Sequence, residues 1–410
     1  MTIAETCRLA GQHAGAAAFS SEEEKNTMLA RAADALVARS EEILAANGED
    51  LARFTREDWL RDRLMLSKAR IEGIAEGLRQ LIALPCPVGE VIERHTTAGG
   101  LDIARVRVPF GVVGIIYEAR PNVTADAVGL CLKSGNAVVL RGSKDAYFSN
   151  AAIVRVIKDA IRACGFDPEF IQLIGDCSRE GAREFMRQRT LDVLIPRGSA
   201  SLIQSTLENA AVPVIETGTG NCHVYVEASA DPEMARRILD NAKTQRISVC
   251  NACESLVVDR AFAAAHLSDL LQPLKEKGVE LVGDEEACAL APAVKPASEE
   301  DYFTEFLAMK LSVRIVGGAE EAIAWINEHS THHSEAIVTR DDAAAEKFLK
   351  EVDSACVYVN ASTRFTDGFE FGFGAEMGIS TQKLHARGPM GLRELTSYKF
   401  VIRGSGQIRQ

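Results

Sequence analysis

The run Gly111-Val112-Val113-Gly114-Ile115-Ile116 marks the point at which the pattern of the chain changes. From here on, short apolar runs alternate with longer segments that carry apolar residues at helical spacing. A short apolar run between turn residues is typical of a strand buried on both faces of a parallel sheet. This alternation predicts a doubly wound sheet, which binds ligands at the carboxyl ends of its strands. The expected strands are 112–116, 137–140, 171–174, 191–195 and 212–215, and the expected helices are 124–133, 148–164, 179–187 and 200–210.

A second α/β region follows toward the C-terminus, joined to the first near residues 216–222 without an obvious flexible linker. On the N-terminal side, residues 1–85 have helical spacing, and Ser21 followed by three glutamates predicts a capped helix start. Gly99-Gly100 separates two alternating runs within residues 90–108, which predicts a β-hairpin. The expected strands of the second region are 223–226, 313–316, 335–338 and 355–359, and its expected helices are 232–243, 320–328 and 342–350.

The composition is that of a globular enzyme-sized chain and excludes several classes of partner. The 410 residues are 47% hydrophobic and 25% charged, with a net charge of -12, so we expect no binding to nucleic acid or to an anionic membrane. No run approaches the roughly 18 apolar residues of a membrane span, and the N-terminus lacks the pattern of a signal peptide. Ten cysteines in such a chain are expected to be reduced, so we expect a cytoplasmic protein.

Cys250 and Cys253 form a lone C-x-x-C before the apolar run 256–258. As a zinc site the pair lacks two further ligands, which His332-His333 alone would not supply convincingly. As a redox dithiol it lacks the surrounding thioredoxin pattern. A cysteine at the junction between elements can also act as a nucleophile, although a buried, inert thiol is the ordinary state of a single cysteine. We interpret Cys250 as the nucleophile.

No motif for a rival nucleophile or for a common nucleotide site is present. The chain has no G-x-S-x-G, no Walker A sequence and no H-E-x-x-H. The G-x-G-x-x-G fingerprint is also missing, since Gly218-Thr219-Gly220 has no third glycine and follows the last strand of the first region. Taken alone, this absence argues against a classical dinucleotide fold.

Three further runs carry a resemblance to a known superfamily. Residues 109–116 (PFGVVGII), Pro121-Asn122 and 135–141 (GNAVVLR) are similar to the aldehyde dehydrogenase superfamily, which binds NAD(P) on a Rossmann-like domain without that fingerprint. Residues 116–124 (IYEARPNVT), 250–256 (CNACESL) and 386–397 (ARGPMGLRELTS) together resemble its γ-glutamyl phosphate reductases. The resemblance extends from about residue 20 to the C-terminus.

The resemblance implies an α/β fold of the aldehyde dehydrogenase type with two doubly wound domains. A Rossmann-like NADP-binding domain would comprise residues 1–90 and 111–218, including the N-terminal helices, and a catalytic domain residues 219–385. Residues 91–110 and 386–410, the hairpin and the C-terminal strand, would form a small β element that joins subunits into a homodimer or homotetramer.

The resemblance also implies a reaction in proline biosynthesis. NADPH would reduce L-glutamyl 5-phosphate to L-glutamate 5-semialdehyde and phosphate through a cysteine thioester. Cys250 matches the catalytic cysteine, Cys253 lies where the family tolerates other residues, and Asn122 matches the asparagine that helps to bind the oxyanion. Glutamate 5-kinase is an expected neighbour because acyl phosphates are short-lived, although no residue indicates a contact.

The cofactor residues follow from the same comparison. Arg141, Ser143 and Lys144 lie in a loop after a strand, where the superfamily holds the adenosine ribose, and two cations there suit the 2′-phosphate of NADPH. Gly198-Ser199 matches the turn near the pyrophosphate, at a helix N-terminus that favours anions, with Arg197 beside it. Glu305 matches the glutamate that binds the nicotinamide ribose.

The residues that select the substrate are less well defined. Ser362, Thr363 and Arg364 follow an expected strand and are candidates for the α-carboxylate, since arginine pairs bidentately with carboxylates. Arg120 is a candidate for the phosphate or the substrate. Glu216 matches the base that hydrolyses the thioester in ordinary aldehyde oxidation, but its flanking sequence departs from that family's pattern, and we assign it no catalytic role.

Two other functions stay open from the sequence. Glu216 keeps a hydrolytic aldehyde dehydrogenase with a different substrate in consideration. A nucleotide-binding regulator with an inactive site is also conceivable, although the presence of Cys250, Asn122 and Glu305 argues against it.

Overall fold

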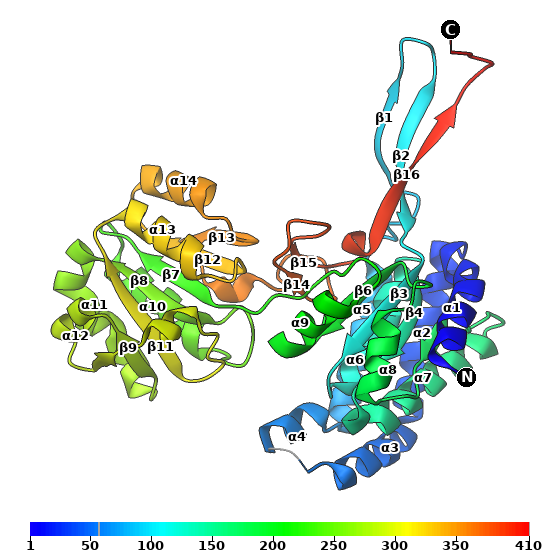
Figure 1. Ribbon diagram of the computed structural model, residues 1–410, viewed down its shortest axis with the longest axis horizontal. Coiled ribbons are helices and arrows are strands. Elements are labelled where there is room, and N and C mark those ends of the chain that lie inside the picture. The colour runs from blue at the N-terminus through cyan, green and yellow to red at the C-terminus, as the bar shows by residue number, and fades with distance from the viewer. Residues whose placement is uncertain (56–57, 410) are drawn as a thin grey trace. The chain divides into compact units, whose positions relative to one another are not determined.

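The computed structural model describes residues 1–55 and 58–409. Residues 56, 57 and 410, which fall within the predicted segments 1–90 and 386–410, lie outside the described part. The chain forms two compact units. Unit 1 comprises Met1–Thr217, Gly372–Gly378 and Met390–Gln410, and unit 2 comprises Gly218–Phe371 and Ile379–Pro389. Each unit contains its own parallel sheet with helices around it (Figure 1), which confirms the predicted α/β fold.

The sheet of unit 1 has the strand order β5-β4-β3-β6, and every pair in it is parallel. Strand β3, one of the two inner strands, is buried at every residue. Burial on both faces is expected for a continuous apolar run in a parallel sheet. The expected strand 212–215 is wrong. Only an isolated bridge joins Leu194 to Val214, because Pro213 has no N–H with which to extend the pairing. The strands are β3 (Val112–Tyr117), β4 (Ala137–Arg141), β5 (Ile171–Leu173) and β6 (Val193–Arg197).

Helices cover this sheet, and several start at capping residues. The Ser21 hydroxyl accepts from the Glu24 N–H, and the Glu24 carboxylate accepts in return from the Ser21 N–H, which confirms the predicted capped start of α2. The helices are α1 (Ile3–Ala18), α2 (Glu22–Ala38), α3 (Ser40–Arg53), α4 (Asp58–Leu64), α5 (Lys68–Ala83), α6 (Pro121–Lys133), η1 (Lys144–Ala146), α7 (Tyr147–Ala163), α8 (Arg179–Met186), α9 (Ala200–Asn209) and η4 (Arg393–Leu395).

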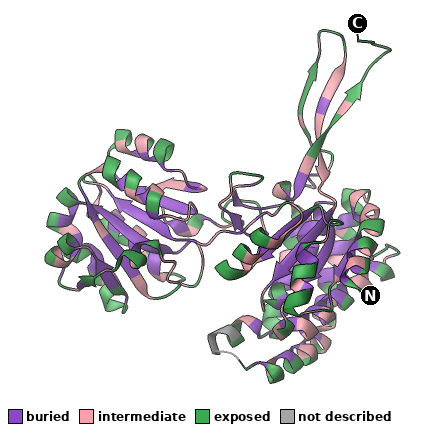
Figure 2. Cartoon of the chain, viewed as in Figure 1, coloured by how far each residue is buried: buried purple, intermediate pink, exposed green. Residues whose placement is uncertain are grey.

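Unit 1 also carries an antiparallel sheet in the order β1-β2-β16. Strands β1 (Val91–Thr96) and β2 (Asp102–Pro109) form the predicted hairpin, and β16 (Thr396–Arg403) pairs with β2 along its whole length. Most of this sheet is exposed or only partly buried (Figure 2). Tyr398, Phe400 and Ile402 alternate along β16 and are 50%, 55% and 57% exposed, so one face of the strand is apolar and open.

Unit 2 has a seven-stranded sheet in the order β10-β9-β11-β8-β7-β12-β13. Strand β8, which follows Cys250, is buried at every residue. The region between β8 and β11 contains two α-helices, the 3₁₀ helix η2 and two short strands that the sequence analysis did not predict. The strands are β7 (Cys222–Val226), β8 (Cys253–Asp259), β9 (Glu280–Gly283), β10 (Val294–Pro296), β11 (Lys310–Val316), β12 (Ser334–Val338), β13 (Cys356–Val359), β14 (Ile379–Ser380) and β15 (Gly388–Pro389), and the helices are α10 (Pro232–Thr244), α11 (Arg260–Glu276), α12 (Glu285–Leu290), η2 (Glu299–Phe303), α13 (Ala319–His329), α14 (Asp342–Glu351) and η3 (Thr363–Phe365).

Candidate active site

Cys250 lies just before β8 in unit 2 and is partly exposed. Cys253, the first residue of β8, is fully buried, and its thiol donates to the carbonyl oxygen of Ser255 at 3.3 Å. Burial raises the pKa of the Cys253 thiol to about 12, so this thiol stays protonated and unreactive near neutral pH. Of the two cysteines, Cys250 is the one that a substrate can reach.

The backbone around Cys250 is held by the segment that leads into β7. A Cβ atom built on Gly220 would lie 1.4 Å from the carbonyl oxygen of Cys250, so only glycine fits there. The thiol of Cys222 donates to the same carbonyl oxygen at 3.1 Å. The N–H of Gly220 in turn donates to Glu305 Oε1 at 2.7 Å. These contacts fix the backbone of Cys250 while leaving its side chain at the surface of unit 2.

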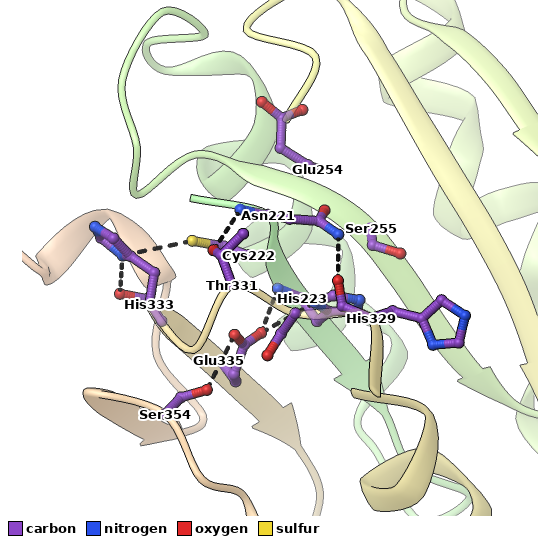
Figure 3. A network of polar contacts seen from close by, with 12 residues as sticks. Asn221, Cys222, His223, Glu254, Ser255, His329, Thr331, His333, Glu335 and Ser354 are labelled. Carbon is purple, nitrogen blue, oxygen red and sulfur yellow. Dashed lines mark hydrogen bonds and ion pairs between the residues drawn. The ribbon is translucent and has the colours of Figure 1, made fainter. Parts of the chain in front are cut away.

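Asn221 connects this segment to the rest of unit 2 (Figure 3). Its Nδ2 donates to the carbonyl oxygens of Tyr302 and His329, both at 2.8 Å, and its N–H donates to Thr331 Oγ1 at 2.9 Å. His333 lies next to Cys222, with Nδ1 3.7 Å from the Cys222 sulfur. Burial lowers the pKa of His333 to about 4, so its imidazole is neutral near neutral pH.

A buried ion pair supports the segment that carries Glu305. Lys243 Nζ lies 2.5 Å from Glu254 Oε2, and both side chains are fully buried. Glu254 Oε1 also accepts from the N–H of Leu307 at 3.0 Å. Burial raises the pKa of Glu254 to about 7 although Lys243 opposes the shift, so burial outweighs the attraction of the lysine.

The loop with the three substrate candidates contacts the residue that follows Cys250. Thr363 Oγ1 donates to the carbonyl oxygen of Asn251 at 2.8 Å, and Asn251 Nδ2 donates back to the carbonyl oxygen of Thr366 at 2.8 Å. Ser362 Oγ accepts from the Arg364 N–H at 3.3 Å and caps η3. The structure thus brings residues 362–366 beside residues 248–252, the cysteine loop: the Ser362 hydroxyl is engaged within its own loop, and the Thr363 hydroxyl bonds to the cysteine loop.

Arg364 is the member of this loop that keeps its cationic group partly open to solvent. Its Nε donates to Gln245 Oε1 at 2.9 Å, which leaves the two terminal nitrogens to point elsewhere. Burial lowers the pKa of Arg364, and the neighbouring Arg246 lowers it further. An arginine in this state gains from an incoming carboxylate.

Unit 1 contains a cavity of about 670 Å³ at the carboxyl ends of its strands. Four of the predicted cofactor residues, Arg141, Ser143, Lys144 and Ser199, line it. Gly198 lies directly before Ser199, whereas Glu305 belongs to unit 2. The other lining residues are Tyr117, Glu118, Asp145, Cys177, Ser178, Arg179, Ala182, Arg183, Met186, Ser201, Leu202 and Ser205. The volume and the cations suit a nucleotide with several phosphates.

The two predicted cationic side chains of this cavity differ in how firmly the protein holds them. Arg141 is only 8% exposed, and its Nη2 donates to the carbonyl oxygen of Ser178 at 2.6 Å. Lys144 is exposed at the start of η1. The guanidinium of Arg141 therefore also supports the turn before α8, while Lys144 can move to meet a ligand phosphate.

Glu118 is a residue of this cavity to which the sequence analysis gave no role. Its Oε1 accepts from the N–H of Ser199 at 3.0 Å, and a Cβ built on Gly198 would lie 2.7 Å from its side chain. The carboxylate thus occupies the N-terminus of α9, where the sequence predicts a pyrophosphate. No signal in the sequence could reveal this contact, because it joins residues from two different strand-to-helix loops.

Asn122 is the second residue of α6 and is exposed in unit 1. Its Nδ2 donates to Asp126 Oδ2, one turn later, at 3.2 Å. Arg120 precedes the helix and is exposed, and Glu216 is partly buried, which raises the pKa of its carboxyl. In residues 1–55 and 58–409, no group of three or more His, Cys, Asp or Glu side chains could hold a metal ion.

Comparisons with known proteins agree with this description. Residues 2–306 match the aldehyde dehydrogenase family. The chain is 54% identical over 402 residues to the gamma-glutamyl phosphate reductase of Shouchella clausii, covering 97% of each protein. It is 58% identical over 352 residues to the gamma-glutamyl phosphate reductase of Moorella thermoacetica, covering 86% of this chain and 84% of the relative.

A solved structure supports the same assignment. The crystal structure of gamma-glutamyl phosphate reductase from Thermotoga maritima matches with a TM-score of 0.98 at 44% identity and covers 100% of both chains. The likeness therefore includes both units and the three-stranded sheet. The chain belongs to the aldehyde dehydrogenase family and, within it, to the gamma-glutamyl phosphate reductases.

Proposed function

We propose that the chain reduces L-glutamyl 5-phosphate with NADPH to L-glutamate 5-semialdehyde and phosphate, as a step of proline biosynthesis. The observation that carries this proposal is Cys250, a partly exposed thiol whose backbone is clamped by Gly220 and Cys222. The names of the relatives that share 54% and 58% of its residues give the substrate. A nucleotide-binding regulator with an inactive site would not need an accessible thiol on a fixed backbone, so this observation argues against that alternative.

The chemistry of an acyl phosphate suits this thiol. The sulfur of Cys250 attacks the acyl carbon, the bond from that carbon to the phosphate oxygen breaks, and phosphate leaves. Asn122 Nδ2 stabilises the oxygen of the tetrahedral state, where one donor is worth roughly 3 kcal/mol. Bound NADPH supplies the hydride that reduces the resulting thioester. The hemithioacetal then collapses, and the thiol recovers its proton as the semialdehyde leaves.

The cavity of unit 1 supports NADPH as the reductant. Lys144 is exposed beside Ser143, and Arg179 and Arg183 line the same cavity. Several cations in one cavity suit the extra 2′-phosphate of NADPH better than the hydroxyl of NADH. In this proposal Lys144 binds the 2′-phosphate, Ser199 faces the pyrophosphate, and Glu305 binds the nicotinamide ribose.

In this proposal two arginines bind the anionic groups of the substrate. Arg364 binds the α-carboxylate, since its bond to Gln245 uses only Nε and burial disfavours its charge. Arg120, exposed at the start of α6, attracts the phosphate. Glu216 takes no part in this direction, because activated water would hydrolyse the thioester and waste the substrate.

The three-stranded sheet of unit 1 supports assembly into a homodimer or homotetramer. Tyr398, Phe400 and Ile402 form an open apolar face on β16, and β1 and β16 leave two unpaired strand edges in the described part of the sheet. Such edges pair readily with a second chain. We also propose a cytoplasmic location, and glutamate 5-kinase as a neighbour that delivers the short-lived acyl phosphate. In the described residues, no helix has the length and apolar character of a membrane span.

The test follows the reverse reaction, NADP⁺ reduction by L-glutamate 5-semialdehyde in phosphate, for Cys250→Ser and Cys253→Ser. The proposal predicts that Cys250→Ser loses activity and that Cys253→Ser, whose thiol is buried and protonated, keeps most of it. A fully active Cys250→Ser enzyme would overturn the proposal. Phosphate-independent release of glutamate would instead favour a hydrolytic aldehyde dehydrogenase, for which the raised pKa of Glu216 would suit a base.

A further inference from the structure

Asp126 lies on α6 one turn after Asn122, and the two side chains are in contact. Asn122 Nδ2 donates to Asp126 Oδ2 at 3.2 Å. A side-chain amide has two N–H donors, so this bond leaves the second N–H of Asn122 to donate to an acyl oxygen. The other oxygen of Asp126, Oδ1, is not used by Asn122.

Among the described residues, no cation forms an ion pair with the carboxylate of Asp126. Burial raises the pKa of Asp126 to about 6, and the hydrogen bond from Asn122 and the charge of Arg197 only partly offset this effect. In the part of the chain that the structure describes, Arg197 makes no ion pair with it. A partly buried carboxylate in this state gains from an incoming cation with N–H donors.

The neighbouring helix α5 leaves space next to this carboxylate. Helices α5 and α6 pack closely elsewhere, since a Cβ on Gly129 of α6 would lie 2.4 Å from Leu78 of α5. Beside Asp126, however, α5 has Gly77, where a Cβ would meet only Asp126 Oδ1 at 3.9 Å. Gly73, one turn earlier, has nothing within 4 Å. Packing does not require either glycine, although glycine destabilises the interior of a helix relative to alanine.

The proposed substrate carries a cation, its α-ammonium group, at a distance from its acyl oxygen that Asp126 can match. Five bonds join the acyl oxygen of L-glutamate 5-semialdehyde to its α-nitrogen, and at about 1.5 Å per bond a bent chain spans roughly 4–6 Å. A carboxylate in contact with the oxyanion donor lies within that range of the acyl oxygen. We propose that Asp126 binds the α-ammonium group of the substrate and thereby selects an amino acid over the corresponding deaminated acid.

This inference rests on the proposed function, and it deepens that function by assigning the amino group. The residue that recognises the amino group would then be Asp126 of unit 1. Asp126 would contact the substrate directly, so its effect should depend on whether the substrate has an amino group. A role limited to orienting Asn122 would affect every substrate equally.

The experiment compares two aldehydes, L-glutamate 5-semialdehyde and its deamino analogue 5-oxopentanoate, each with NADP⁺ and phosphate. Asp126→Asn removes the charge and keeps the size of the side chain. We expect kcat/KM for the amino substrate to fall on the order of a hundredfold, mainly through KM, and kcat/KM for 5-oxopentanoate to change little. Asp269→Asn, at an exposed position of α11, serves as the control for loss of one surface charge.

A second variant tests the space beside the carboxylate. Gly77→Ala places a methyl group at van der Waals distance from Oδ1, so the variant folds and its helix gains stability. We expect a severalfold higher KM for the amino substrate and an unchanged KM for 5-oxopentanoate. NADPH affinity, to which the cavity of unit 1 contributes, reports whether both variants are folded.

Each outcome decides the proposal. Equal losses on both aldehydes in Asp126→Asn would show that Asp126 acts only through Asn122, and no loss on either would show that it has no role; both results overturn ammonium binding. A wild-type enzyme that oxidises neither aldehyde in a phosphate-dependent manner would instead reject the proposed function and with it this inference. That failure is visible before any variant is made.

Discussion

The Cα of Gly220 lies against the peptide of Cys250 so closely that an added Cβ would come within 1.4 Å of the Cys250 carbonyl oxygen. Gly220→Ala therefore has to displace the cysteine loop. Because a misplacement of about 1 Å can cost a hundredfold in rate, we expect kcat to fall at least about a hundredfold. The rate at which iodoacetamide alkylates Cys250, followed by mass spectrometry, should also differ from that of the wild type. Gly48→Ala, where a Cβ meets nothing within 4 Å, is the matched control, and wild-type activity in Gly220→Ala would refute the clamp.

Removing the buried lysine of unit 2 should destabilise the protein. Lys243→Met leaves the carboxylate of Glu254 buried without its partner 2.5 Å away, which costs roughly 3–5 kcal/mol of unfolding free energy. Adding Glu254→Gln should restore part of this loss, since the amide oxygen can still accept from the Leu307 N–H. Urea denaturation measures both. The exposed pair Lys277–Asp240 is the control, and Lys277→Met should cost less than about 1 kcal/mol.

His333 should make unit 2 sensitive to acid. Burial lowers the pKa of His333 from 6.5 to about 4, so the folded state binds the proton less well than the unfolded state. The stability from the neutral imidazole is complete above the unfolded pKa and is lost as the pH falls toward the folded one. At about 1.4 kcal/mol per pKa unit, the loss is roughly 3 kcal/mol.

His333→Gln removes the titrating group and tests this assignment. The urea midpoint of the wild type should fall between about pH 7 and about pH 4, and the variant should show a smaller fall over the same range. The variant can be less stable at neutral pH, because Nδ1 of His333 also interacts with Ser334 Oγ at 2.8 Å. Parallel pH profiles for the two proteins would contradict the assignment.

Lys144 should contribute to the preference for NADPH. It is exposed beside the cavity of unit 1, whereas Arg141 also supports the Ser178 turn and is a less selective probe. Losing one charge-assisted contact to the 2′-phosphate should weaken NADPH binding roughly ten- to a hundredfold in Lys144→Ala. NADH binding should change little. Fluorescence titration measures both affinities, and equal losses for the two nucleotides would place Lys144 elsewhere on the cofactor.

The elements that can be predicted from the sequence are those marked by a run or a periodic spacing of apolar residues within the element itself. Strands β3 and β4 were predicted because their continuous apolar runs are buried on both faces. Strands β9 (ELVG) and β10 (VKP) escape prediction because they are short and, unlike the equally short β5, do not belong to a run of apolar residues. Proline at position 213 limited the expected strand 212–215 to one bridge.

The site was predictable where a residue acts by its own chemistry and less so where it acts through a contact. Cys250 was predicted from its residue type and its position between elements, and Lys144 from the resemblance; both roles stay predictions. The contacts of Glu118 with Ser199 and of Cys222 with Cys250 join distant residues, and periodicity does not report such contacts. The contact of Asn122 with Asp126 was hidden by an element boundary, because the expected helix began at residue 124 and α6 begins at Pro121.

The central claim, a thioester on Cys250 that phosphate and not water resolves, is tested most directly by mixing the enzyme with L-glutamate 5-semialdehyde and NADP⁺ without phosphate. The account predicts a burst of a single equivalent of NADPH per chain, a glutamyl adduct on Cys250 in the acid-quenched protein, and steady turnover once phosphate is added. Continuous NADPH formation without phosphate, with no adduct on Cys250, would contradict it and would give Glu216 the role of a hydrolytic base.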